Sequence, residues 1–292
     1  MRRRLTALLV ALALTSVGAF LMPEAAHARK HAQSTAVPAP LLGGFRVKDI
    51  TWATADAQIG PGKVTREFYG TLPTTFSDFG LPLGVKIVVS YKTLTTNVAA
   101  YLRSIPAGRD VELAFHHEPE GDYTTGAQFV SEFNGQEQVA HAAAPAVPFD
   151  YIGLSYHYMT GQDTSWLPPA ADRYYVDSYQ RGGTGYSKIQ PLPQTPQFVN
   201  FAASLKAAGH RFDGFTEYGR GVIPTGGVIS VADVSARQQV YSTDRAYIDS
   251  TLRPATPHPF VWAYWYTSGS AGQWRLLDGA SQQAWRSAST TP

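Results

Sequence analysis

The chain has 292 residues and contains no cysteine. Disulfides, thiolate metal sites and cysteine nucleophiles are therefore excluded. Charged side chains are also scarce, at 16% of residues, whereas aromatic side chains make up 12%. A chain without disulfides must be stabilised by its core alone, and this length supplies enough buried surface for one domain.

Long apolar runs are absent except at the N-terminus. There, Leu5–Leu21 follows the three arginines Arg2–Arg4 and precedes the small-x-small sequence Ala26–Ala28. This order predicts a secretory signal peptide over residues 1–28, with an uncleaved N-terminal anchor as the alternative. No later stretch approaches the ~20 apolar residues that a membrane helix needs. We therefore expect a secreted, extracellular protein without membrane association after cleavage.

A basic or acidic surplus is also missing. Removing the three arginines and one glutamate of the signal peptide from 24 basic and 22 acidic residues leaves 21 of each. A neutral chain without a basic patch offers no electrostatic attraction for nucleic acid or anionic membranes. Internal repeats and a second linker are not found either. We expect a flexible lead-in over residues 29–42 and one catalytic domain over residues 43–288.

Short β-rich runs recur along this domain and alternate with helix-like or turn-rich stretches. Eight runs are predicted as strands: Phe45–Trp52, Val64–Tyr69, Val85–Tyr91, Val111–Phe115, Tyr151–Tyr158, Tyr174–Asp177, Phe212–Thr216 and Phe260–Tyr266. Alternating strands and helices indicate an α/β fold with a parallel sheet. Eight strands predict a single-domain (β/α)8 TIM barrel. A doubly wound sheet is the alternative, but no G-x-G-x-x-G motif follows the first strand.

Two glutamates follow strand-like runs directly. Glu118 comes after the fourth run, in VELAFHHEPEGDY, and Glu217 comes after the seventh, in FDGFTEYGR. In a (β/α)8 barrel the active site lies at the C-terminal ends of the strands, where both side chains would meet. Two carboxyl groups in one cleft suit glycoside hydrolysis: one protonates the leaving oxygen, and the other attacks the anomeric carbon or activates water. Each glutamate alone would be an ordinary charged residue at a loop start.

This pair of glutamates resembles the hallmark of clan A glycoside hydrolases. Most of that clan has Asn before the acid/base on strand four, whereas this chain has His117-Glu118. The His-Glu pair is similar to glycoside hydrolase family 26, which contains β-mannanases with some xylanases and β-glucanases. FHHEPEGDY resembles the acid/base segment of its divergent bacterial members, and TEYG resembles its nucleophile segment. The resemblance covers residues 43 to 275.

The resemblance implies roles for individual residues. Glu118 would be the acid/base and Glu217 the nucleophile, and His117 would contact the nucleophile or the sugar. Tyr179 would match the tyrosine that hydrogen-bonds the nucleophile, with Tyr175 as the alternative.

Aromatic residues complete the set of expected sugar contacts. The resemblance makes Trp265 the platform under the sugar at the cleavage point. Trp262 and Trp265 are three residues apart on one strand and face opposite sides, so at most one lines the site. Tyr156 ends the fifth run, where lining the cleft and packing elsewhere are both open.

Other readings of these segments are less well supported. His116, His117, Glu118 and Glu120 together suggest a metal cluster, but they lack the H-E-x-x-H helical spacing. Glu120 lies beyond a proline and ranks below Glu118 as the acid/base. The sequence GLSYH at 153–157 nearly matches a serine nucleophile elbow, but its last position is not glycine.

The sequence therefore predicts a secreted retaining glycoside hydrolase that acts on a β-linked polysaccharide or oligosaccharide. β-Mannan is the first candidate substrate, as for an endo-β-mannanase, with xylan and β-glucan as alternatives. We expect no cofactor, no metal, no nucleic-acid partner and a monomeric protein. The alternative function is a non-catalytic carbohydrate-binding barrel. Endo and exo action are both left open.

Overall fold

A computed structural model describes residues 38–182, 189–222, 230–269 and 272–290 of the protein. The signal peptide predicted over residues 1–28 and the lead-in up to residue 37 lie outside the described residues. Within the described ranges, no helix is long and apolar enough to cross a membrane.

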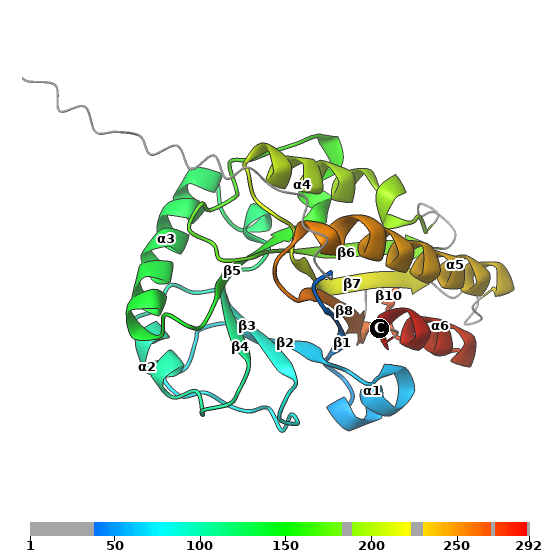
Figure 1. Ribbon diagram of the computed structural model, residues 1–292, viewed down its shortest axis with the longest axis horizontal. Coiled ribbons are helices and arrows are strands. Elements are labelled where there is room, and N and C mark those ends of the chain that lie inside the picture. The colour runs from blue at the N-terminus through cyan, green and yellow to red at the C-terminus, as the bar shows by residue number, and fades with distance from the viewer. Residues whose placement is uncertain (1–37, 183–188, 223–229, 270–271, 291–292) are drawn as a thin grey trace, which may run out of the picture. The chain divides into compact units, whose positions relative to one another are not determined.

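Eight parallel strands close into a barrel (Figure 1). Each strand pairs with its successor, and β8 pairs with β1 to complete the ring. The strands are β1 Leu41–Val47, β2 Val64–Tyr69, β3 Lys86–Tyr91, β4 Val111–Phe115, β5 Phe149–Leu154, β6 Tyr174–Gly182, β7 Gly214–Val222 and β8 Phe260–Tyr266. The (β/α)8 barrel predicted from the alternating pattern is thereby confirmed.

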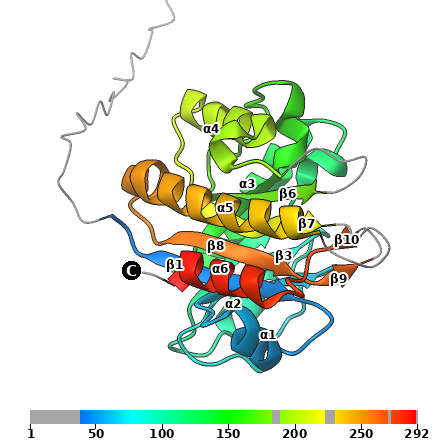
Figure 2. The ribbon, with the colours of Figure 1, turned by 90° about the vertical axis from the view of Figure 1, so that its right-hand side faces the viewer.

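Helices surround the strands on the outside of the barrel (Figures 1 and 2). The α-helices are α1 Trp52–Ile59, α2 Val98–Arg103, α3 Gly126–Ala143, α4 Pro196–Ala207, α5 Val231–Tyr247 and α6 Gly279–Thr290. Short helical turns are η1 Pro119–Gly121, η2 Ser155–Thr160, η3 Leu192–Gln194, η4 Ile248–Leu252 and η5 Arg253–Ala255. The fully described connections from β2 to β3 and from β5 to β6 contain no α-helix.

The prediction of a first strand over Phe45–Trp52 was wrong in its bounds. β1 ends at Val47, and Trp52 is already the first residue of α1. The Thr51 side chain accepts a hydrogen bond from the backbone N–H of Thr54, 3.2 Å away, and so caps this helix. An N-cap threonine with helix-forming residues after it outweighs the apolar character of the segment.

The fifth, sixth and seventh predicted strands also differ from the observed ones. β5 ends at Leu154, and the second half of the predicted run forms the 3₁₀ turn η2. β6 continues beyond Asp177 to Gly182, and β7 continues beyond Thr216 to Val222. These two strands extend because they pair with each other over their whole C-terminal halves, a long-range contact that local sequence does not encode.

The core has two parts, one inside and one outside the ring of strands. The inner cluster consists of small and medium-sized side chains with one tyrosine: Val64, Val88, Ala114, Ile152, Tyr175, Val261 and Ala263. The outer cluster between strands and helices is rich in aromatic rings. Trp285 of α6 is fully buried there, with its ring centroid 4.7 Å from that of Trp262. Many of the abundant aromatic residues therefore serve packing.

A short hairpin extends the barrel at the end to which β7 and β8 point (Figure 2). Its strands are β9 Ser268–Gly269 and β10 Gly272–Gln273, and β10 pairs antiparallel with the end of β7. The hairpin thus brings the residues that follow β10 to the C-terminal mouth of the barrel.

Truncating Trp285 tests the contribution of the outer core. We expect Trp285→Ala to lower the free energy of unfolding by about 3–5 kcal/mol, because a fully buried ring is replaced by a cavity. Val231→Ala is the matched control on α5, since this side chain is 82% exposed and should cost less than about 0.5 kcal/mol. Urea unfolding measures both, and similar values for the two variants would contradict this packing role.

Candidate active site

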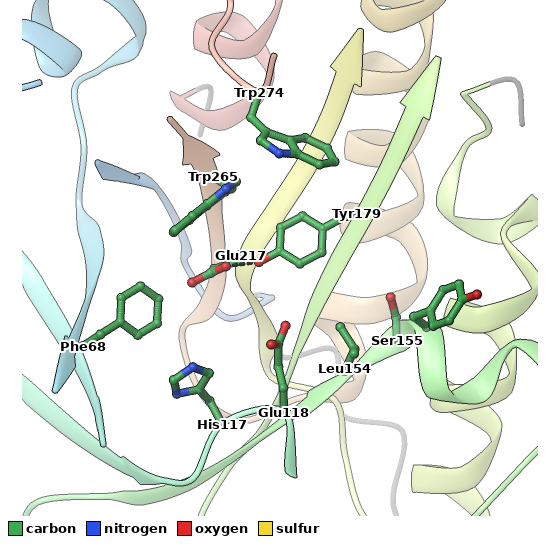
Figure 3. A pocket seen from close by; sticks show the side chains of 10 residues that line it. Phe68, His117, Glu118, Leu154, Ser155, Tyr179, Glu217, Trp265 and Trp274 are labelled. Carbon is green, nitrogen blue, oxygen red and sulfur yellow. Dashed lines mark hydrogen bonds between the residues drawn. The ribbon is translucent and has the colours of Figure 1, made fainter. Parts of the chain in front are cut away.

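Glu118, in the turn after β4, and Glu217, within β7, line the same cavity (Figure 3). The cavity has a volume of about 500 Å³, within the ~300–1,000 Å³ usual for ligand pockets. It lies at the C-terminal ends of the strands, where barrel enzymes hold their active sites. Its lining residues are Phe68, His117, Glu118, Leu154, Ser155, Tyr156, Tyr179, Glu217, Trp265 and Trp274.

The chain turns sharply as it leaves β4. His116 and Glu118 both adopt left-handed backbone conformations, with φ of 49° and 52°. Such conformations cost non-glycine residues of order 1–3 kcal/mol and occur preferentially at functional sites. Two neighbouring strands hold this turn: the N–H of His116 donates to the Tyr91 carbonyl at 2.6 Å, and the N–H of Glu118 donates to the Ile152 carbonyl at 2.8 Å.

Lys92 and Asp122 brace the same turn from outside the cavity. The Lys92 ammonium donates to the His117 carbonyl at 2.5 Å and to Asp122 at 2.7 Å. The His116 ring lies between the Lys92 carbonyl, 2.6 Å from Nδ1, and Asp122, 2.9 Å from Nε2. His116, for which the sequence indicated no role, is therefore part of this brace, whereas His117 faces the cavity.

A buried arginine and a tyrosine contact Glu217. One guanidinium nitrogen of the fully buried Arg66, on β2, lies 3.2 Å from Glu217 Oε1. The Tyr179 hydroxyl donates to Oε2 of the same carboxylate, as the dashed line in Figure 3 marks. Arg66 also forms an ion pair with Asp177, which in turn accepts a hydrogen bond from the Thr216 hydroxyl at 2.7 Å.

Tyr179, and not Tyr175, contacts the Glu217 carboxylate. Tyr175 belongs to the inner core, and its hydroxyl donates to Glu112 at 2.7 Å. Tyr179 lies within β6, which runs further than the sequence predicted. The sequence left open which tyrosine contacts Glu217. The continuation of β6 beyond Asp177 places Tyr179 beside this carboxylate.

A β-bulge in β7 turns two consecutive side chains toward the barrel interior. Val176 of β6 pairs with Phe215, and Asp177 pairs with Glu217, so that Thr216 is an extra residue. In a regular strand, Thr216 and Glu217 would face opposite sides. With the bulge, Thr216 reaches Asp177 and Glu217 reaches the cavity, as expected of bulges next to active sites.

Three carboxyl groups, of Glu118, Asp177 and Glu217, share the charge of Arg66. Burial, together with the charge of Asp177, raises the pKa of Glu118 to about 7. Burial also raises the pKa of Glu217, against the opposing attraction of Arg66. One cation does not neutralise three buried anions, so at least one of these groups keeps its proton near neutral pH.

Aromatic rings form the walls of the cavity. Trp265 lines it, whereas Trp262 packs in the outer core against Trp285, consistent with opposite faces of β8. Phe68 lies 5.0 Å from His117 and 6.1 Å from Trp265, measured between ring centroids. Burial lowers the pKa of His117, and the positive charge of Arg66 lowers it further, so this ring is neutral.

Trp274 is a wall residue that sequence reasoning missed. It follows the hairpin, and its ring centroid lies 5.4 Å from that of Tyr179. A side chain at Gly219 or Gly221 of β7 would approach the indole to 2.9 or 2.8 Å, so glycine at both positions makes room for it. The glycines of the segment EYGRG were the only sequence signal of this contact.

Tyr156 and Glu120 lie on the β5 side of the site. Tyr156 lines the cavity and is 68% exposed. Glu120 is outside it: its carboxylate accepts hydrogen bonds from the Tyr151 hydroxyl at 2.6 Å and from the Leu154 N–H at 3.2 Å. It thus ties the turn after β4 to the end of β5. Over the described residues, no group of three or more His, Asp or Glu side chains is placed to hold a metal ion.

No protein-family model matches the chain, and neither does any curated protein sequence. Solved structures do match. A β-glucuronidase from Bacteroides uniformis is 13% identical with a TM-score of 0.51, covering 77% of this chain and 30% of its own. A β-galactosidase from Bacteroides fragilis, described as putative, is 11% identical with a TM-score of 0.53, covering 86% and 42%. A ruminal GH26 endo-β-1,4-mannanase is 9% identical with a TM-score of 0.49, covering 86% and 63%.

Replacing Arg66 tests whether it compensates the buried carboxyl groups. Arg66→Met should destabilise the protein by about 3–5 kcal/mol, because it leaves buried acids without their cation. Without Arg66, the pKa of these acids is higher in the folded protein than in the unfolded protein, where it is ~4. The free energy of unfolding therefore falls as the pH rises above ~4. Urea unfolding should therefore show a larger cost at pH 8 than at pH 5.

Arg103→Met is the matched control, since Arg103 is exposed at the end of α2. It should change the free energy of unfolding by less than about 0.5 kcal/mol at either pH. A pH-independent cost for Arg66→Met, or one as small as the control's, would contradict charge compensation.

The matched structures are longer than this protein, which spans 30–63% of their length. At these identities the similarity is one of fold only. It agrees with the closed ring of eight strands described above. The chain thus has a (β/α)8 barrel of the kind found in β-glycosidases.

Proposed function

We propose that this protein is a secreted retaining glycoside hydrolase that cleaves a β-linked polysaccharide. The observation that carries the proposal is that Glu118 and Glu217 line one cavity, where Glu217 is in contact with Arg66 and Tyr179. An acid and a nucleophile need different surroundings, and these two carboxyl groups have them.

In the first step, a Glu217 oxygen attacks the anomeric carbon, and the bond from that carbon to the leaving oxygen breaks. Glu118 transfers its proton to the leaving oxygen. In the second step, a water oxygen attacks the anomeric carbon while Glu118 takes a proton from the water, and the bond to Glu217 breaks. Both glutamates return to their starting forms, and the anomeric configuration is retained.

The contacts of each glutamate support this division of roles. Burial raises the pKa of Glu217, and the ion pair with Arg66 and the hydroxyl of Tyr179 oppose this by stabilising its anionic form; they also orient its oxygens. Glu118 has a pKa raised to about 7 by burial, so it holds a proton to donate at neutral pH. A general acid works best when its pKa lies near the working pH.

The substrate is assigned by chemistry and by resemblance. A neutral chain with tryptophan walls in the cavity suits uncharged sugar rings, whose C–H faces pack against aromatic surfaces. The β-linkage follows the names of the matched β-glucuronidase and β-galactosidase. β-Mannan is the first candidate because His117-Glu118 resembles family 26, with xylan and β-glucan next.

A substrate screen tests the activity itself. The secreted protein should release reducing ends from at least one of β-mannan, xylan, β-1,3-glucan and mixed-linkage glucan, and Glu217→Ala should release none. Saccharide binding without any product would instead establish the alternative, a non-catalytic carbohydrate-binding barrel.

Separate variants test the two roles. Glu118→Ala should slow polysaccharide cleavage by about 10²–10⁴-fold, because the leaving oxygen then lacks its proton donor. It should largely spare glycosyl fluorides, whose leaving group needs no proton. Glu217→Ala should lose activity on both kinds of substrate. Initial rates on both substrates measure this, and equal losses on the fluoride would contradict the assigned roles.

The pH dependence follows from Glu118. Because Glu118 must be protonated to act as the acid, kcat/KM on a polysaccharide should fall as the pH rises through about 7. The same profile recorded for Glu118→Gln on a glycosyl fluoride should lack this alkaline limb. A limb that persists in Glu118→Gln would assign it to another group.

A further inference from the structure

A second and larger cavity, of about 650 Å³, opens where β1 and β2 end. Its polar lining includes Arg46 and Glu67, near the ends of these strands. Its apolar lining includes Trp52 at the start of α1 and Phe79 in the loop between β2 and β3. The proposed reaction does not use this cavity, although its volume lies in the ~300–1,000 Å³ range of ligand sites.

Arg46 and Glu67 have unused hydrogen-bonding capacity in this cavity. Their side chains are only 12% and 16% exposed, yet the closest approach of guanidinium and carboxylate is 3.7 Å. This separation exceeds hydrogen-bond length. The Nε of Arg46 is buried and has no hydrogen-bond partner within the described chain. The accessible atoms of the guanidinium and the carboxylate could each hydrogen-bond to a ligand that carries hydroxyl groups.

Phe79 is held in a left-handed backbone conformation with φ of 55°. For a bulky side chain this is a clear outlier, and such strain gathers at ligand sites. Across the ranges that the structure describes, only His116 and Glu118 share this conformation among non-glycine residues. Glu118 is the proposed acid/base and His116 belongs to the same turn, whereas Phe79 lines the second cavity.

Arg46 connects the second cavity to the wall of the active site. The Arg46 guanidinium lies over the Phe68 ring, 4.9 Å from its centroid, and Phe68 lines the active-site cavity. On the other side, at the β4 and β5 ends, a third cavity of about 410 Å³ shares Leu154 and Tyr156 with the active site. Since β1 and β5 are opposite each other in the eight-strand ring, the active-site cavity lies between the other two.

We infer that the Arg46–Glu67 cavity binds an uncharged sugar unit of the substrate chain, on the side away from the leaving group. Glu118 protonates the leaving oxygen from the β4 side, so the departing part extends toward Tyr156 and the retained part toward β1 and β2. Sugar hydroxyls would bridge Glu67 and Arg46, and the C–H face of the ring would pack on Phe79. This inference rests on the proposed glycosidase function.

Phe79→Asn is the main test, because asparagine tolerates the left-handed conformation and lacks the ring. The substrates are β-1,4-mannohexaose, β-1,4-xylohexaose and laminarihexaose, each compared with the 4-nitrophenyl glycoside of its single sugar. We expect the ratio of kcat/KM for the cleaved hexasaccharide to that for the glycoside to fall about tenfold, as for the loss of one packing contact.

Leu83→Asn is the matched control in the same loop: Leu83 is 78% exposed and does not line the cavity. This variant should leave the ratio unchanged. Glu67→Gln removes the charge and keeps the shape of the side chain, and it should also lower the ratio. It provides a second test should Phe79→Asn fold poorly, which thermal unfolding would show.

Calorimetric titration of the hexasaccharides into Glu217→Ala separates this inference from the proposed function. If the native protein cleaves none of them, the glycosidase proposal fails. In that case, the sugar site would still be supported if the double variant with Glu217→Ala and Phe79→Asn bound a hexasaccharide about tenfold more weakly than Glu217→Ala alone. If cleavage is normal and neither the ratio nor the affinity responds to Phe79→Asn or Glu67→Gln, the inference fails and the proposed function stands. Absence of binding to all three sugars also overturns it.

Discussion

The buried guanidinium of Arg66 is the constraint on which the site depends. It is fully enclosed at the C-terminal end of the barrel interior and contacts both Asp177 and Glu217. A cation buried there requires carboxylates, and the pKa of the nearby Glu118 is raised by its own burial and by the charge of Asp177, against the attraction of Arg66. One arginine from β2 therefore ties together acids that β6 and β7 supply, and it favours the charged forms of both glutamates.

The backbone is arranged around this charge cluster at some cost. Two left-handed residues shape the turn after β4, and a bulge in β7 turns Thr216 and Glu217 toward the same interior. Outside the cavity, Lys92 and Asp122 hold the strained turn in place. Rigid support of this kind keeps reacting groups oriented, so that little reorganisation is needed when charge develops.

Much of the fold could be predicted because several strands are buried and apolar along their length. The runs Val64–Tyr69, Val111–Phe115 and Phe260–Tyr266 have the predicted bounds. Prediction was wrong where other forces dominate: a threonine cap converts the end of the first run into α1, and strand pairing lengthens β6 and β7. Capping is local but competes with apolar character, and pairing is not local at all.

The sequence by itself predicted the barrel and placed two glutamates near its mouth, because the C-terminal ends of the strands meet there. Both glutamates do line one cavity, although Glu217 lies within β7 and not after it. It did not determine the partners of these acids. Arg66 and Trp274 come from β2 and from the segment after β10, far along the chain, and both reach Glu217 or Tyr179 only when the ring closes. The bulge in β7 likewise depends on pairing with β6. Side-chain direction is set by register between distant strands, and only the tertiary structure fixes that register.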